Sequence, residues 1–203
     1  MYFVRPPYLL NKAYKKAIWR IPTNKREVYL TFDDGPVPEI TPWVLSTLKE
    51  YNATATFFCV GENVLRYPEI YRQIISEKHS VGNHTFNHLN GWKTRTAIYL
   101  DNIQKCSELV SSNLFRPPYG KLKRSQYSSL LSNQYSIIMW DVLSGDFDKN
   151  TSPEKCLRNI LESTREGSII VLHDSIKSKK NLLYVLPKIL AFFSNKGISL
   201  KGL

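Results

Sequence analysis

The chain has 203 residues, a net charge of +11, 42% hydrophobic residues and 22% charged residues. These values fit one globular domain and exclude a largely disordered chain. The basic residues are scattered apart from short clusters at 12–20 and 177–180, and no zinc-finger or basic-zipper pattern is present. We therefore expect no nucleic-acid partner.

The cysteine content and the hydrophobic runs bear on the cellular compartment. The chain has three cysteines, which is an odd number, and they form no CxxC pair. This usage suits a reducing compartment better than a disulfide framework. No secretory signal is evident at the N-terminus, and no run reaches the roughly 18 apolar residues needed to cross a membrane. We therefore predict a cytoplasmic location.

Residues 1–25 are predicted to form a basic, partly helical appendage, and residues 26–203 to form the main domain. Within residues 9–18, Leu10, Tyr14, Ala17 and Ile18 fall on one side of a helix and the lysines lie elsewhere. Such a helix either associates weakly with an anionic membrane surface or packs on the domain itself. Binding of the full chain, but not of a chain lacking residues 1–20, to anionic vesicles would separate the two. The oligomeric state is left open.

Beyond this appendage, β-rich runs alternate with amphipathic runs, which is typical of parallel strands joined by helices. The predicted strands are residues 28–32, 55–60, 80–82, 114–116, 135–140, 168–172 and 198–200. The predicted helices are residues 41–50, 68–77, 94–111, 124–131, 152–165 and 182–194, and residues 141–148 are expected to form a loop. Right-handed crossovers then give either an open doubly wound sheet or a barrel.

Polar side chains at the strand ends favour the barrel. Six of them fall at or just beyond the carboxyl ends of predicted strands: Asp33, Asp34, His84, Arg116, Asp146 and His173. Catalytic groups converge at that end of α/β barrels. We therefore predict the fold class α/β, as a single-domain incomplete (β/α) barrel with about seven parallel strands.

A pair of histidines and a pair of aspartates together suggest a metal site. Two of the chain's four histidines, His84 and His88, are four residues apart, so they share one face of a helical turn and both can reach one ion. Asp33 and Asp34 are adjacent in an extended chain, where neighbouring side chains point in opposite directions and can take different roles. One carboxylate with two histidines suits a catalytic Zn²⁺ or a similar divalent ion. His79 lacks such a context and is expected at the surface.

Four short motifs occur in order along the chain. They are Thr-Phe-Asp-Asp-Gly at 31–35, His-Thr-Phe-Asn-His at 84–88, Arg-Pro-Pro-Tyr-Gly at 116–120 and Leu-His-Asp at 172–174. Their order and spacing resemble those of the polysaccharide deacetylases, carbohydrate esterase family 4, which includes chitin, chitooligosaccharide and peptidoglycan deacetylases. The resemblance runs over residues 28–200 and implies an incomplete (β/α) barrel.

The resemblance also implies roles for the residues of the first three motifs. Asp34, His84 and His88 would ligate the metal, for which Zn²⁺ is favoured and Co²⁺ or Ni²⁺ are alternatives. Asp33 would be the general base that takes a proton from water. Arg116 would keep Asp33 ionised and oriented, because a nearby positive charge favours the carboxylate form.

Further roles come from the later motifs, one of which departs from the family pattern. The backbone N–H of Tyr119 would stabilise the oxyanion, and His173 would protonate the leaving amine. The family has a further motif, fourth of five in chain order, which is commonly D-S-x-D-W; here residues 143–147 read Leu-Ser-Gly-Asp-Phe. Asp146 is kept and would orient His173, whereas Leu143 and Phe147 replace the usual Asp and Trp. This part of the pocket is therefore expected to be reshaped, which affects substrate choice more than catalysis.

The resemblance implies a hydrolase that removes acetyl groups from N-acetylated amino sugars in oligo- or polysaccharides and releases acetate. An O-acetyl ester deacetylase of a polysaccharide is the alternative enzyme, because the same site would serve an ester. A non-catalytic carbohydrate-binding relative is a third reading, which the presence of Asp33 and His173 disfavours. The expected partner is an acetylated carbohydrate, whose rings Trp92 and Tyr119 are placed to stack against.

Overall fold

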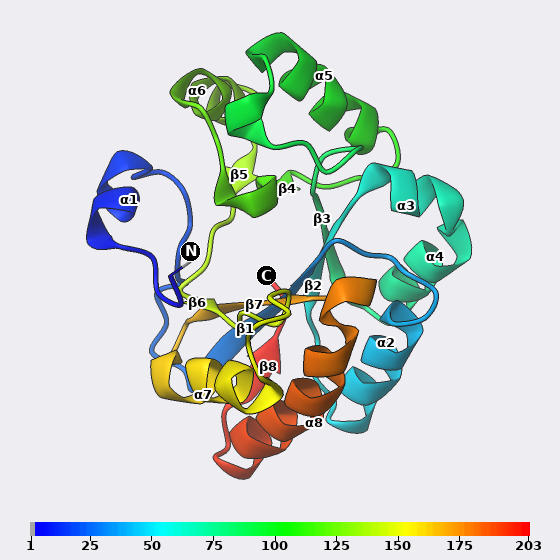
Figure 1. Ribbon diagram of the computed structural model, residues 1–203, viewed down its shortest axis with the longest axis vertical. Coiled ribbons are helices and arrows are strands. Elements are labelled where there is room, and N and C mark those ends of the chain that lie inside the picture. Colours follow the sequence, from blue (N-terminus) through cyan, green and yellow to red (C-terminus); the bar gives the residue numbers. More distant parts are fainter. Residues whose placement is uncertain (1–2) are drawn as a thin grey trace.

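A computed structural model describes residues 3–203; the first two residues of the predicted appendage lie outside this part of the chain. Parallel strands curl into an incomplete barrel with helices around its outside (Figure 1), so the predicted fold class is confirmed. The strand order is β5-β4-β3-β2-β1-β7-β6, and β8 also pairs with β1. The strands are β1 (Glu27–Asp33), β2 (Thr56–Cys59), β3 (Ser80–Asn83), β4 (Leu114–Phe115), β5 (Ser136–Ile137), β6 (Val142–Leu143), β7 (Ile169–His173) and β8 (Ser199–Lys201).

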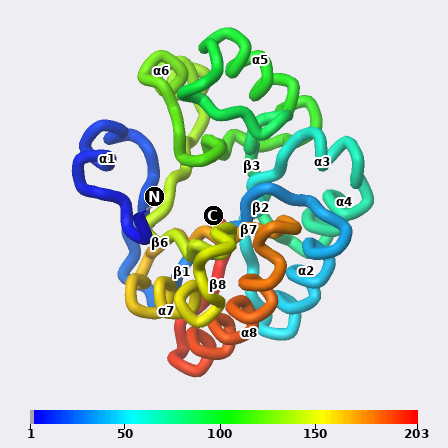
Figure 2. Tube along the Cα trace, viewed as in Figure 1, coloured from blue at the N-terminus to red at the C-terminus, as the bar shows by residue number. Residues whose placement is uncertain are grey.

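Helices connect the strands around the outside of the sheet, as the trace in Figure 2 shows. The α-helices are α1 (Tyr8–Ala13), α2 (Thr41–Glu50), α3 (Gly61–Arg66), α4 (Pro68–Ser76), α5 (Thr96–Ser107), α6 (Arg124–Ser132), α7 (Pro153–Ser163) and α8 (Lys179–Asn195). Proline lies in the first turn of α2, α4 and α7, where its missing N–H costs no hydrogen bond. Among residues 3–203, no helix combines the length and hydrophobicity needed to span a bilayer.

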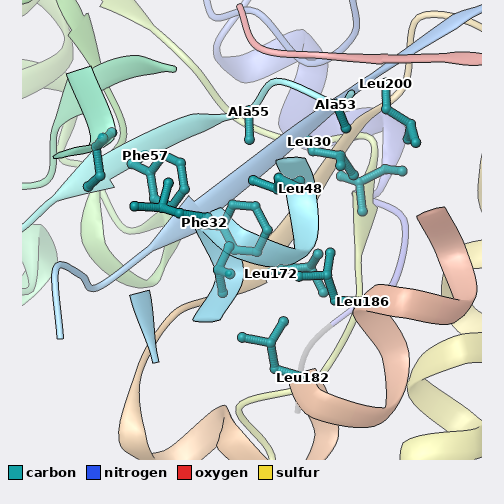
Figure 3. Close-up of a cluster of buried hydrophobic side chains, with 14 of the residues drawn as sticks. Leu30, Phe32, Leu48, Ala53, Ala55, Phe57, Leu172, Leu182, Leu186 and Leu200 are labelled. Carbon is teal, nitrogen blue, oxygen red and sulfur yellow. The ribbon is translucent and has the colours of Figure 1, made fainter. Parts of the chain in front are cut away.

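A buried apolar cluster fixes the central strand β1 against the helices on one side of the sheet. Figure 3 shows Leu30 and Phe32 of β1 near Leu172 of β7, with Leu48 of α2 and Leu186 of α8 in the same cluster. All five side chains are essentially inaccessible to solvent. Burial of each such side chain contributes about 1.5–3 kcal/mol to folding, so the end of β1 is held firmly.

The strand register brings the polar ends of neighbouring strands together. Asp33 of β1 is paired with His173 of β7 on one side and with Phe58 of β2 on the other. Asn83, which precedes His84, is paired with both Cys59 of β2 and Phe115 of β4. The carboxyl ends of β1, β3, β4 and β7 therefore meet at one end of the half-barrel.

The N-terminal segment of residues 3–21, here called the N-terminal arm, runs along the open side of the half-barrel between β5 and β6. The Leu143 N–H of β6 donates a hydrogen bond to the Val4 carbonyl at 2.8 Å. Ile18 donates to the Ile137 carbonyl of β5 and accepts from the Met139 N–H, each at 2.8 Å. The arm therefore spans the gap that the two edge strands leave. That residues 1–25 are a unit distinct from residues 26–203 stays a prediction.

Two short elements were not expected from the sequence. Strand β6 lies within residues 141–148, which were expected to form a loop, and α3 lies where no helix was predicted. A two-residue strand has no periodicity of its own; β6 is defined by its pairing of Val142 with Ile170 and of Leu143 with Val171 on β7. Strand β5 likewise covers only part of the predicted strand at 135–140.

His79 is not at the surface, as its sequence context suggested, but buried. Its Nδ1 accepts a hydrogen bond from the Ala55 N–H at 3.2 Å, and its ring lies edge-on to Phe57 at 5.4 Å. The imidazole thus satisfies a backbone donor at the start of β2, and burial lowers the pKa of His79. We assign it a structural role.

Candidate active site

Asp33 lies at the end of β1 in a buried ion pair with Arg116. Arg116 Nη1 donates to Asp33 Oδ1 and to Thr31 Oγ1, each at 2.7 Å. Its Nη2 donates to the Met139 carbonyl at 3.0 Å, and its guanidinium carbon lies 4.1 Å from the centre of the Phe58 ring. With every side of the guanidinium engaged, Arg116 has little freedom and holds the Asp33 carboxylate in one orientation.

Asp34, His84 and His88 form the one group of three potential metal ligands among residues 3–203, and their coordinating atoms all lie within 4.8 Å of one another. His88 Nε2 is 3.1 Å and His84 Nε2 is 3.8 Å from Asp34 Oδ1. His84 Nδ1 is 2.8 Å from the Arg116 carbonyl, so Nδ1 carries the hydrogen and Nε2 keeps its lone pair toward Asp34. Burial lowers the pKa of His84 to about 4, which keeps the ring neutral, as a metal ligand must be.

The two histidines do not share a helical turn, so that part of the prediction is wrong. They lie in an irregular loop after β3, where Thr85 and His88 have φ of 62° and 53°. The Asn102 carboxamide oxygen accepts hydrogen bonds from two backbone N–H groups of this loop. His88 Nδ1 lies 3.1 Å from the Tyr119 hydroxyl. Loop anchoring, rather than helical periodicity, brings His84 and His88 to one point.

Asp34 has the strained backbone and the electrostatics of a functional carboxylate. Its φ is 84°, and its carbonyl accepts a hydrogen bond from Asn63 Nδ2 at 2.7 Å. Lys177 Nζ lies 3.0 Å from its Oδ2. Burial acts to raise the pKa of Asp34, but the hydrogen bond from His88 and the charges of His173 and His88 outweigh it and hold that pKa well below its usual value. Asp34 is therefore ionised and available to a cation.

His173 ends β7 and is coupled to Asp146. His173 Nδ1 is 2.8 Å from Asp146 Oδ1, and the His173 backbone N–H donates to Asp146 Oδ2 at 2.8 Å. Ser144 Oγ donates a further hydrogen bond to Asp146. Burial by itself lowers the pKa of His173, but the charge of Asp146 and its hydrogen bond, with smaller effects from Asp34 and Asp33, raise it to about 9. His173 is thus positioned to carry a proton at neutral pH.

The carboxylates and imidazoles of the site, apart from the fully buried Asp146, open into one cavity of about 530 Å³. Its floor contains Asp33, Asp34, His84, His88 and His173, with Lys177 at the side. Its walls are mostly apolar and include six residues of the N-terminal arm: Phe3, Pro6, Pro7, Leu10, Tyr14 and Trp19. A polar floor beneath apolar walls is typical of a site that binds an organic substrate.

Comparison with known proteins agrees with this geometry. Residues 20–137 match the sequence profile of the polysaccharide deacetylase family. The chain belongs to this family. It is 38% identical over 160 residues to a peptidoglycan-N-acetylglucosamine deacetylase of Bacillus cereus, covering 76% of this chain and 58% of that protein. It is 36% identical over 162 residues to a chitooligosaccharide deacetylase of Azorhizobium caulinodans, covering 76% and 77% of the two chains.

Among solved structures, the chain is similar to the Bc1960 peptidoglycan N-acetylglucosamine deacetylase in complex with 4-naphthalen-1-yl-N-oxidanyl-benzamide. The TM-score is 0.89 at 33% identity, covering 98% of this chain and 95% of that one. The fold of this deacetylase-family chain thus agrees with that structure over almost its whole length.

The departure of this polysaccharide deacetylase from its family's fourth motif lies beside the pocket. Leu143 is buried and lines the cavity, and its backbone N–H anchors the N-terminal arm through Val4. Phe147 packs edge-on against His173 with ring centres 5.0 Å apart. Both replacements make the wall near His173 more apolar than Asp and Trp would.

Two further residues, Asp174 and Lys177, contact the site without having been predicted from the sequence. Asp174 Oδ1 accepts from the Gly35 N–H at 3.1 Å and its Oδ2 accepts from Thr41 Oγ1 at 2.6 Å, which fixes the turn after Asp34. A Cβ on Gly35 would collide with this carboxylate, so the turn requires glycine. Asp174 could have been found because it ends the Leu-His-Asp motif. Lys177 had no such signal beyond its nearness to His173 in sequence.

Proposed function

We propose that this chain is a metal-dependent hydrolase that removes acetyl groups from N-acetylated amino sugars in oligo- or polysaccharides containing N-acetylglucosamine. The observation that carries the proposal is the pairing of Asp33 with His173 on adjacent strands. Asp33 is ion-paired to the buried Arg116, and His173 to the buried Asp146. Asp33 and His173 both open into the cavity that contains the Asp34, His84 and His88 cluster.

The three clustered side chains suit a divalent ion, for which Zn²⁺ is favoured and Co²⁺ or Ni²⁺ are alternatives. Such an ion, when bound, supplies Lewis acidity toward the acetyl carbonyl and lowers the pKa of water. The donor set fits, because His84 offers a neutral Nε2 lone pair and Asp34 an ionised carboxylate. Measurement of the metal content of the purified protein identifies the ion.

The remaining residues divide the proton transfers between them. Asp33 takes the proton of the attacking water, whose oxygen bonds to the acetyl carbon, and Arg116 keeps that carboxylate oriented. The Tyr119 N–H donates to the carbonyl oxygen as it gains negative charge. As the C–N bond breaks, His173 gives its proton to the amine nitrogen while Asp146 holds the imidazole, and acetate leaves.

The rim of the cavity supports a sugar substrate. Trp92 and Tyr119 are exposed there, and aromatic faces of this kind stack on pyranose rings. The B. cereus and A. caulinodans relatives are named for acetylated carbohydrates. The ligand in the Bc1960 structure is a hydroxamic acid, a group that chelates divalent ions, which supports a metal site in this chain. We further propose a cytoplasmic location, which cell fractionation would test.

Acetate release tests this function. The protein loaded with Zn²⁺ or Co²⁺ is expected to release acetate from N-acetylglucosamine oligomers, to lose this activity with a chelator, and to regain it with added metal. His173→Ala should abolish amide hydrolysis, and comparison with acetyl xylan separates amide from ester preference. If the metal-loaded protein releases no acetate from any acetylated amine or ester, the hydrolase proposal fails.

A further inference from the structure

The N-terminal arm has two sets of apolar side chains with different surroundings. Tyr14, Ala17 and Trp19 pack against the cluster formed with α5 and α6, which agrees with packing on the domain's own surface. Helix α1, in contrast, has no buried residue, and it stands clear of the other helices in Figure 1. Tyr8 and Leu9 are 77% and 74% exposed, so the fold does not use them.

Tyr8 and Leu9 stand in the chain between Pro7 and Leu10, which line the cavity, so these exposed side chains lie near its mouth. Phe3 and Leu10 are exposed and also line the cavity. Trp92 and Tyr119 are exposed cavity residues contributed by other segments of the chain. Exposed apolar residues gathered at one cavity mark an interaction surface rather than scattered surface residues. Tyr and Trp are moreover the residues preferred at the boundary between lipid and water.

The charge of the arm identifies the partner. Residues 3–21 contain five Lys or Arg and no Asp or Glu. Lys12, Lys15 and Lys16 of the arm are exposed, and Lys121 borders the cavity. Arg5 is also exposed but lies 3.9 Å from Asp141, and Lys177 is paired with Asp34. Exposed apolar residues next to basic residues, with no acid in the arm itself, complement the surface of a bilayer that contains anionic lipids. A second copy of this basic face would be repelled.

We propose that the N-terminal arm docks this protein on an anionic lipid bilayer, with the mouth of the cavity against the membrane. Phe3, Tyr8, Leu9 and Leu10 enter the headgroup region, and the neighbouring lysines contact lipid phosphates. If the proposed function holds, the preferred substrate is then an acetylated amino sugar attached to a lipid, because its sugar lies at the height of the cavity while its lipid part stays in the bilayer.

Co-sedimentation with vesicles tests the docking. The full chain is expected to sediment with vesicles of equimolar phosphatidylglycerol and phosphatidylcholine, and to stay in solution with phosphatidylcholine alone or in high salt. Tyr8→Ser/Leu9→Ser should weaken vesicle binding at least about tenfold. The matched control is Leu65→Ser/Ile98→Ser, whose side chains are 61% and 50% exposed away from the arm. The control should bind like the unmodified chain.

Two matched double variants that reverse surface charges sharpen the same test. Lys12→Glu/Lys15→Glu and Lys149→Glu/Lys155→Glu each lower the net charge by four, from +11 to +7, but only the first pair lies on the arm. Only the first is expected to weaken binding, again by at least about tenfold. An equal loss of vesicle binding in the two double variants would show a general charge effect and overturn the proposed docking surface. A dimer that Tyr8→Ser/Leu9→Ser dissociates would overturn it in favour of self-association.

Acetate assays separate this proposal from the proposed function. Tyr8 and Leu9 do not line the cavity, so Tyr8→Ser/Leu9→Ser should hydrolyse soluble oligomers at the unmodified rate. An N-acetylglucosamine oligomer coupled to a phospholipid in anionic vesicles should react faster than the free oligomer, and this variant should remove the difference. Activity on soluble oligomers without vesicle binding overturns the docking alone. Vesicle binding without any deacetylation overturns the proposed function alone.

Discussion

The two sides of the cavity are built in different ways. The floor comes from strand ends whose positions follow from sheet pairing and a buried core, and its charged groups are fixed by short hydrogen bonds such as that from Arg116 to Asp33. The wall on the open side comes from the N-terminal arm. The arm is attached through a few backbone hydrogen bonds and the packing of Tyr14, Ala17 and Trp19, and it exposes much of its remaining apolar surface. Changes in the floor should therefore affect chemistry and folding, whereas changes in the arm should affect which substrate binds.

The largest effect is expected from Asp33→Asn. Asparagine keeps the size of the side chain but cannot accept the proton of the attacking water, so kcat should fall by about 10²–10⁴-fold. The metal content should be unchanged, because Asp34, His84 and His88 remain. A kcat within a factor of a few of the unmodified value, measured by acetate release, would exclude Asp33 as the base.

Removal of Arg116 should mainly reduce stability. Arg116→Met leaves Asp33 as a buried carboxylate without its partner, which should lower the free energy of unfolding by about 3–5 kcal/mol in urea denaturation. Arg116→Met combined with Asp33→Asn removes both charges and should recover part of this loss. If the double variant is no more stable than Arg116→Met alone, the broken ion pair is not the cause of the lost stability.

The His173–Asp146 pair should make both the free energy of unfolding and kcat depend on pH in the alkaline range. The pKa of His173 is raised from 6.5 to about 9, mainly by Asp146 acting against burial. The pair's contribution to stability is then fully present below pH 6.5 and is lost as the pH rises through about 9. Asp146→Asn should flatten this part of a plot of unfolding free energy against pH, and should move the alkaline limb of kcat to lower pH. Identical profiles for both proteins would contradict the assignment.

The smallest effect is expected in the arm. Leu10→Ser removes apolar contact from the cavity rim and should raise KM for an oligosaccharide about two- to fivefold without changing kcat. Leu183→Ser is the control, because Leu183 and Leu10 are each 40% exposed and only Leu10 lines the cavity. A fall in kcat for Leu10→Ser would mean that the arm influences the floor.

The floor could be predicted from the sequence because its residues stand next to segments whose structure is recognisable. Asp33, Asp34 and His173 follow directly after recognisable apolar strands, and parallel strands bring their carboxyl ends together. His84 and His88 were correctly placed near this end, but their helical turn was wrong, because the hydrogen bonds of Asn102 that shape the loop come from α5. Burial of His79 depends in the same way on a distant partner, the Ala55 N–H.

The arm wall could not be predicted, because its structure depends on contacts across almost the whole chain. Val4 is hydrogen-bonded to Leu143, and Ile18 to Ile137 of β5. Contacts between residues so far apart in the chain leave no local periodicity in the sequence. Strand β6 was missed for the same reason, since only its pairing with β7 defines it. Lys177 reaches Asp34 from η3 (Ile176–Ser178), whose position also follows from tertiary packing.

The path of the N-terminal arm between β5 and β6 makes the enzyme modular. A strand cannot be replaced without moving the aspartates and histidines, but residues 3–19 contribute no side chain to the metal cluster or to the proton transfers. Substitutions at the arm's exposed positions 8–10 therefore leave the catalytic floor in place. If the proposed function holds, exchange of the arm would redirect the chain to other carriers of the acetylated sugar without redesign of its catalytic floor.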